Sequence, residues 1–425
     1  MTSYDLHLID SSTRTPETDA WTRAVLLGFL DADPVDAVLA TFAESRAADD
    51  ARLRAVRPTD DRDTLPGQVA APLATFRSWD NTINTGHGHL EPANFITDVT
   101  VRQTERRRGM LRTMMMTDLH EARDRGQSLA ALTVTEATIY SRFGFGVATA
   151  IHELALDIRH GFGLRHEPAG RVVHLDPAAE GTAQTWTRVF DQFHAQTFGS
   201  AGASAHHLAA LTGRFNWTDG SVDRAVRTVA HVDESGAVDG VLSYKINNGD
   251  ELQVIDLVPL NPEAELGLWA FIGHHDLLER AVWRRGNPDG PLRWALTDSR
   301  RLKVTGVMDG IWLRVLDIAA ALRVRHFERD GRLLAGEVVL GIDDPTGITP
   351  GIWRLVVRDG IAEAEPTTHD PDVTMGVDTF ASLYLGGVSA QVLAAAGRLH
   401  GGPAAVAALA DLFGVSVAPR SLRYF

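Results

Sequence analysis

The residues best suited to chemistry in this sequence form a short basic stretch, Arg106–Gly109, with the sequence RRRG. A strand-like segment, Phe95–Val101, precedes it, and apolar residues at helical spacing follow it. A basic turn that opens a helix offers a phosphate backbone N–H groups, the positive end of the helix dipole and guanidinium donors. Gly109 also allows close backbone approach. These residues predict a pyrophosphate site, although an arginine-rich helix start taken alone is more often a solvated face.

Coenzyme A carries the groups that such a site would bind: a pyrophosphate, a 3′-phosphate and an amide-bearing arm. The backbone edge of Val99–Val101 could pair with the amides of the arm, as an added strand would. The residues predicted to bind this ligand are Val99, Thr100, Val101, Arg107, Arg108, Gly109, Met110, Leu111, Arg112, Thr135 and Glu136. No metal site is predicted, and the absence of cysteine excludes disulfides and thiolate ligands.

Two motifs resemble the signatures of the GNAT acetyltransferase superfamily. Arg106-x-x-Gly109-x-Leu111 is similar to its Arg/Gln-x-x-Gly-x-Gly/Ala signature, with leucine at the last position. Downstream, Ile139–Phe145 is similar to its Tyr-x-x-x-Gly-Phe segment. A narrower resemblance is to the Eis (enhanced intracellular survival) family, in which leucine at that position is not unusual. The segments that carry it are Val99-x-Val101, Arg106–Arg112, Glu136-x-x-Ile139-Tyr140-x-Arg142-Phe143-Gly144 and Ala148-Thr149.

The resemblance covers the whole chain and implies an α/β (α+β) fold of three domains. Residues 1–152 would form a GNAT acetyltransferase domain with the acetyl-CoA site, and residues 153–303 a degenerate GNAT-like domain. Residues 304–425 would form a sterol-carrier-protein-like domain. That match is carried by Ile311–Arg314, Ser382–Gly387 and Leu393–Leu399. The family also implies a homohexamer that acetylates several amines of one aminoglycoside.

Acyl transfer from a thioester to an amine needs a neutral amine, donors for the charge that develops on the carbonyl oxygen, and an acid for the leaving thiolate. Tyr140 is predicted to be that acid. Its phenol is protonated at neutral pH, and it follows the strand-like Leu129–Val134, which should flank the thioester. The same tyrosine could instead be a core residue whose hydroxyl is hydrogen-bonded.

No side chain of the first domain stands at a compelling spacing for the base. The candidates there are His87, His89, Glu91 and His120. The family resemblance implies instead the α-carboxylate of the last residue, Phe425, reaching back into the first domain. A free α-carboxyl has a pKa of about 3.3–3.7, which burial among aromatic groups would raise. The apolar residues near the end, including Tyr424, favour an ordered chain end over a frayed one.

The acceptor must present an amine. A formal net charge of -14 favours cationic small molecules and disfavours nucleic acid and anionic membranes as partners. Acidic residues that could recruit the acceptor are Asp31, Asp33, Asp36 and Glu91. Each of them could equally be an ordinary solvated carboxylate. Aminoglycosides, polyamines and protein lysine side chains are all compatible with these residues.

The second segment repeats the order of elements in the first in weaker form. Leu252–Val258 resembles Phe95–Val101, but Asn261-Pro262-Glu263 follows it in place of a basic, glycine-containing turn. This indicates a duplicated domain without phosphate-binding groups. Together with a lipid-carrier-like third segment, it leaves an alternative function open: a lipid- or metabolite-binding scaffold with a vestigial acyltransferase site.

Length and composition agree with this organisation. A chain of 425 residues predicts two to four domains. No apolar run approaches the ~18–20 residues that cross a bilayer. The N-terminal residues lack the pattern of a signal peptide. The expected location is the cytoplasm, without integral membrane association.

Overall fold

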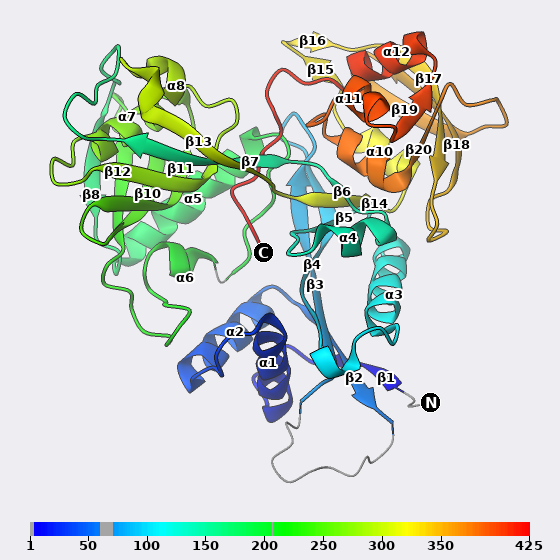
Figure 1. Ribbon diagram of the computed structural model, residues 1–425, viewed down its shortest axis with the longest axis horizontal. Coiled ribbons are helices and arrows are strands. Elements are labelled where there is room, and N and C mark those ends of the chain that lie inside the picture. Colours follow the sequence, from blue (N-terminus) through cyan, green and yellow to red (C-terminus); the bar gives the residue numbers. More distant parts are fainter. Residues whose placement is uncertain (1–3, 60–70, 206) are drawn as a thin grey trace.

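The computed structural model describes residues 4–59, 71–205 and 207–425. Its principal strands pair into three sheets, each accompanied by helices (Figure 1). This mixed α/β architecture confirms the predicted fold class. In the described part of the chain, no helix combines the length and the apolar composition that a membrane span needs.

The first sheet has the strand order β1-β2-β3-β4-β5-β14-β6. Its strands are β1 (Tyr4–Ile9), β2 (Arg52–Pro58), β3 (Ala74–Asn84), β4 (Leu90–Val101), β5 (Leu129–Leu132), β14 (Trp312–Val315) and β6 (Gly146–Val147). The helices of this domain are α1 (Pro16–Phe29), α2 (Asp36–Ala48), α3 (Met110–Asp124) and α4 (Ala137–Tyr140). The pair β4 and β5 is parallel, and α3 connects these two strands.

The second sheet has the order β13-β7-β12-β11-β10-β9-β8. Its strands are β13 (Leu302–Asp309), β7 (Ala150–Asp157), β12 (Arg280–Gly286), β11 (Glu251–Pro259), β10 (Val238–Asn247), β9 (Arg227–Val232) and β8 (Arg171–Leu175). The helices are α5 (Glu180–Gln196), α6 (His207–Leu211), α7 (Pro262–Gly273) and α8 (Leu292–Ala295). As in the first domain, a parallel strand pair, β11 and β12, is connected by one helix, α7.

The third sheet has the order β19-β18-β17-β20-β21. Its strands are β19 (Ile361–Pro366), β18 (Gly351–Arg358), β17 (Gly336–Asp343), β20 (Val373–Gly376) and β21 (Leu399–Gly401). The helices are α9 (Ile318–Val324), α10 (Val377–Tyr384), α11 (Ala390–Ala395) and α12 (Pro403–Phe413), and a short ribbon joins β15 (Glu328–Arg329) to β16 (Arg332–Leu333).

Strands pass between the domains in a way that the sequence order does not predict. The boundary expected after residue 152 falls inside β7, and the one expected after residue 303 falls inside β13. These two strands pair with each other in the second sheet. The next strand, β14, returns to the first sheet and pairs with β5 over Leu129–Leu132. Strand β14 thus lies between β5 and the two-residue strand β6, and it pairs with both.

Two helices of the first domain position the site. Helix α1 starts at Pro16 behind a Thr15 cap, buries Trp21 and Val25, and ends at Leu30 in a left-handed conformation (φ 66°). Helix α3 buries a face that includes Met114, Met115, Leu119 and Ala122. Met115, Leu119 and Ala122 are spaced three to four residues apart, as on one side of a helix. That burial fixes the direction of α3 and so the place of its N-terminus.

Candidate active site

The first domain opens between β4 and β5. Their parallel pairing runs from Ala93 and Leu129 to Ile96 and Leu132. Beyond that point β5 ends, whereas β4 continues to Val101. On its other side β4 pairs with β3, but with a bulge: Phe76 faces two residues of β4, and one of them, Asp98, has a φ of 53°. A bulge leaves one residue without a partner in the strand pairing and changes the direction of the backbone and side-chain groups next to it.

A cavity of about 730 Å³ extends from this opening to the start of α3. The structure brings all eleven residues of the predicted coenzyme A site into its lining. Sequence reasoning missed further lining residues, among them Gly28, Phe29 and Leu30 at the end of α1. In the sequence, these residues simply continue the apolar face of a helix, so no local signal marks them as part of a pocket.

The N-terminus of α3 is open to an anion. Gly109 stands at the cap position with a φ of 82° and has no side chain that could occupy the first N–H groups. The residues that carry these groups, Met110, Leu111 and Arg112, line the cavity. The positive end of the helix dipole therefore meets the cavity at the position where the sequence predicts a pyrophosphate.

The guanidinium groups around this turn differ in their contacts. Arg108 donates to the hydroxyl of Tyr4 and lies 3.1 Å from the carboxylate of Glu105, so it is held at the edge of the cavity. Arg107 and Arg112 are exposed and have no hydrogen bond or ion pair within the described residues. They are the side chains best placed to bind the phosphates of a ligand through charge-assisted hydrogen bonds.

Tyr140 ends α4 and is nearly buried, with 8% of its surface exposed. Burial, with smaller contributions from Tyr424 and Glu136, raises the pKa of its phenol to about 12. The phenol is therefore protonated throughout the neutral range and can serve as a proton donor.

A second cavity of about 210 Å³ adjoins the first. The two cavities share Phe29, Val99, Thr135 and Tyr140 in their linings. The end of the chain, Tyr424 and Phe425, also lines the smaller cavity. Tyr140 thus stands at the junction of a long basic cavity and a short one that is lined by the C-terminus.

Phe425 is held in the first domain by aromatic packing. Its ring contacts Phe95 with the centroids 4.6 Å apart, and it meets Trp79 edge-on with the centroids 5.4 Å apart. The hydroxyl of Thr133 donates to a carboxyl oxygen of Phe425. The hydroxyl of Tyr424 donates to the carbonyl of Val134 over 3.3 Å. The last two residues of the chain are therefore ordered against β3, β4 and the segment that follows β5.

The other candidate bases lie away from these cavities. His87 pairs with Glu328 of the third domain, and His89 pairs with Glu91 over 3.0 Å. These residues lie around the turn that leads into β4, at the opposite end of the strand from Val99–Val101. His120 is an exposed residue in the middle of α3. None of the four lines either cavity.

The acidic residues expected to recruit the acceptor have other surroundings. Asp33 pairs with Arg23, and Asp36 pairs with Arg14. Asp31 is exposed, and the second carboxyl oxygen of Glu91 accepts from Ser128 over 2.7 Å. None of these carboxylates lines the two cavities. The acidic group beside the smaller cavity is Asp98 in the bulge of β4, which sequence reasoning did not select.

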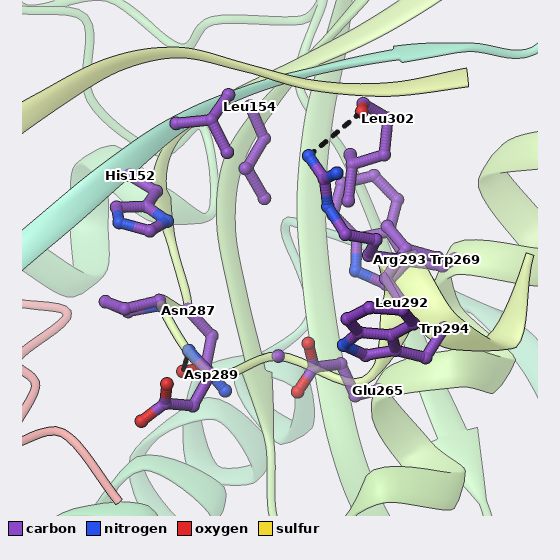
Figure 2. Close-up of a pocket in the computed structure, with 13 residues that line it drawn as sticks. His152, Leu154, Glu265, Trp269, Asn287, Asp289, Leu292, Arg293, Trp294 and Leu302 are labelled. Atoms are coloured by element: carbon purple, nitrogen blue, oxygen red, sulfur yellow. Dashed lines mark hydrogen bonds between the residues drawn. The ribbon is translucent and has the colours of Figure 1, made fainter. Parts of the chain in front are cut away.

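The second domain lacks the equivalent anion site. Its helix α7 begins after Asn261, whose side chain accepts from the N–H of Ala264 over 2.8 Å and so caps the helix. Figure 2 shows a pocket of about 230 Å³ beside α7 and α8, with Glu265, Asp289 and Trp294 around it. The Asn261 cap and the carboxylates in the first turn of α7 disfavour phosphate binding there, in agreement with the absence of a basic turn in the sequence.

Comparison with known proteins supports this description. Residues 67–148 and 209–323 each match an acetyltransferase (GNAT) domain, and residues 318–420 match a sterol carrier protein domain. The chain is 32% identical to an uncharacterized N-acetyltransferase of Streptomyces avermitilis over 412 residues, which cover 93% of each protein. It is 30% identical to the N-acetyltransferase Eis of Mycobacterium tuberculosis over 347 residues, which cover 80% of this chain and 77% of the relative.

Solved structures show the same three-domain fold. Eis1 from Mycobacterium abscessus has a TM-score of 0.79 at 24% identity, and the match covers 99% of this chain and 100% of that one. A GCN5-related N-acetyltransferase from Kribbella flavida has a TM-score of 0.73 at 25% identity and covers 99% of both chains. With the relatives above, these matches show that the chain is an N-acetyltransferase of the Eis family, within the GNAT superfamily.

Proposed function

We propose that this enzyme transfers the acetyl group of acetyl-CoA to amines of a cationic small molecule, with aminoglycosides as the substrate class and Tyr140 and Phe425 as the catalytic residues. One observation carries the proposal: Tyr140 and the chain-terminal residue Phe425 line the same small cavity, and that cavity adjoins a basic one. The first cavity suits the acetyl donor, and the second suits the acceptor amine.

The donor would lie along β4 with its phosphates at the start of α3. The N–H groups of Met110, Leu111 and Arg112, together with the guanidinium of Arg107, would bind the pyrophosphate. The arm would then follow the open edge of Val99–Val101 towards the junction of the cavities. The bulge in β4 makes the N–H of Val99 the candidate donor to the thioester oxygen, because Val99 lines both cavities.

The acceptor amine would enter the smaller cavity and lose a proton to the carboxylate of Phe425. Its nitrogen then attacks the carbonyl carbon, and a tetrahedral intermediate forms with negative charge on oxygen. When the intermediate collapses, the carbon–sulfur bond breaks and the phenol of Tyr140 donates its proton to the leaving sulfur. The products are the amide and the free thiol. The phenolate regains its proton from the acylated nitrogen, which leaves the neutral amide, and the carboxyl group of Phe425 releases its proton to water.

Two features favour a cationic acceptor. The chain carries a net charge of -14, which attracts cations, and Phe425, which ends in the chain-terminal carboxyl group, lines the smaller cavity. The resemblance to the Eis family is what suggests aminoglycosides as the substrate class. The first domain keeps a donor cavity, and no side chain caps its helix α3, whereas Asn261 caps the corresponding helix α7 of the second domain. This difference argues against the scaffold alternative, in which the acyltransferase site would be vestigial.

A thiol-release assay with acetyl-CoA tests this function. The acceptors are a panel of aminoglycosides, linear polyamines and lysine-containing peptides, each at the same amine concentration. We expect thiol release with aminoglycosides and, by mass spectrometry, products that carry one or more added acetyl groups. Release with polyamines or peptides alone would assign another acceptor class, and no release with any amine would contradict the proposal.

A further inference from the structure

The last residues of the chain run from the second domain into the first. Figure 1 shows the C-terminus between the second domain and the strands β3 and β4. Leu422 belongs to the hydrophobic core of the second domain, whereas Phe425 packs on the core of the first. The four residues from Leu422 to Phe425 thus connect the two duplicated domains at their inner faces.

The two domains present equivalent clefts to this segment. In the first domain the parallel pairing ends at Ile96, and Asp98 follows two residues later on β4. In the second domain it ends at Val254, and Asp256 follows two residues later on β11. Asp98 lines the cavity that receives Phe425. Asp256, at the matching position, binds Arg423.

Arg423 is fully enclosed at this second cleft. Its guanidinium lies 2.6 Å from the carboxylate of Asp256 and 3.7 Å from the ring centroid of Phe190 on α5. The side chains of Arg423 and Asp256 are 3% and 0% exposed. A buried ion pair of this kind contributes specificity of position more than stability, and loss of one partner leaves an uncompensated charge.

Residues on both sides of Arg423 also form hydrogen bonds with the second domain. The backbone N–H of Arg420 donates to the carbonyl of Phe198 over 3.1 Å, and Ser421 Oγ accepts from the N–H of Ala201 over 3.3 Å. His207 Nε2 lies 2.8 Å from the carbonyl oxygen of Tyr424. The second domain therefore holds the tail up to the residue before Phe425.

We propose that the cleft of the second domain is a binding site for the chain's own C-terminal peptide, with Arg423 and Asp256 as positioning residues. Phe425 is two positions after Arg423, a span of at most about 7 Å, so the ion pair limits where the terminal carboxyl group can lie. This inference rests on the proposed role of that carboxyl group and gives the second domain a function in the same reaction.

Tail position can be measured separately from activity. A carboxypeptidase specific for aromatic C-terminal residues is added to the full-length protein, and loss of Phe425 is followed by intact mass. Cleavage tracks the population in which the tail is released. We expect slow loss from the wild type and loss about tenfold or more faster from Arg423→Gln and Asp256→Asn, because each substitution breaks the buried pair. Their kcat should fall in parallel, with the Kd of acetyl-CoA unchanged.

Two variants guard against misfolding and non-specific effects. The double variant Asp256→Asn/Arg423→Gln removes both charges of the pair together, and it should still release the tail. Arg398→Gln removes an ion pair with the same 2.6 Å separation on the surface of the third domain. It should leave both cleavage and kcat unchanged.

The outcomes separate the two proposals. Faster cleavage with a lower kcat supports both of them. Faster cleavage with an unchanged kcat supports the peptide-binding site and contradicts the catalytic role of Phe425. Unchanged cleavage in Arg423→Gln and in the double variant overturns the peptide-binding site, whatever the activity.

Discussion

Tyr140 and Phe425 line one cavity of about 210 Å³ although one belongs to the first domain and the other ends the third. Burial is the main cause of the raised pKa of Tyr140, and Tyr424 next to the chain end adds a smaller electrostatic contribution in the same direction. In the proposed mechanism, the proton donor and the proton acceptor would therefore be assembled only when the chain end is in place. Chemistry proposed for the first domain would then depend on residues 422–425.

Replacing Tyr140 with phenylalanine tests the proton donor. The substitution removes the hydroxyl and keeps the ring that packs against Phe145. We expect kcat to fall by about 10²–10⁴-fold, the usual contribution of general acid catalysis. The Kd of acetyl-CoA, measured by calorimetry, should stay within about twofold of the wild-type value, since the ring is retained. An unchanged kcat would exclude Tyr140 as the acid.

The pH dependence of kcat provides an independent test of the same residue. The pKa of Tyr140 is raised to about 12, so its reactive, protonated form persists across the alkaline range. We expect no loss of kcat between pH 8 and about pH 10 under saturating substrates, where an unperturbed phenol with a pKa of about 10 would already be half ionised. A decline in kcat with a midpoint near pH 10 would contradict the assignment.

Arg112 tests the phosphate site. We expect Arg112→Gln to raise the KM for acetyl-CoA by about tenfold, because an exposed charge-assisted hydrogen bond contributes on the order of 1.5 kcal/mol. The kcat should be unchanged, since the phosphates lie far from the reacting atoms. Arg123→Gln is the matched control, because Arg123 is exposed in the last turn of the same helix. Equal effects of the two substitutions would argue against a local phosphate site.

The binding stoichiometry tests the degeneracy of the second domain. Asn261 caps α7, and Glu263 and Glu265 lie in its first turn, so the second domain should bind no coenzyme A. Isothermal titration with acetyl-CoA should give one site per chain. In Arg107→Gln/Arg112→Gln the affinity of that single site should fall, and no second binding event should remain. Two equivalents bound per chain would show that the second domain retains a donor site.

The donor site could be predicted from the sequence because its parts are local. A strand, the basic turn, Gly109 and helix α3 follow one another directly, and the conformation of each is set by neighbouring residues. Thr135 and Glu136 come shortly after β5 in the sequence. Because β5 is parallel to β4, the residues that follow β5 lie near the end of β4. Local sequence therefore determined most of this cavity.

Long-range packing was not predictable in the same way. The aromatic pair Trp79 and Phe95 that receives Phe425 looks like ordinary strand composition, and Arg423 carries no motif. The exchange of β7, β13 and β14 between sheets also depends on pairing between distant segments. The chain-terminal carboxyl group is proposed as the base through family resemblance alone, because the charge and spacing of its neighbours give no signal.

The catalytic role of the chain end is the centre of this account, and one added residue tests it most directly. An alanine after Phe425 moves the carboxyl group by about 3.3–3.6 Å while leaving the Phe425 ring and the tail contacts available. We predict that kcat for acetyl transfer falls to background while the Kd of acetyl-CoA and the melting temperature remain those of the wild type. Wild-type kcat in this extended protein would contradict the account and place the base elsewhere.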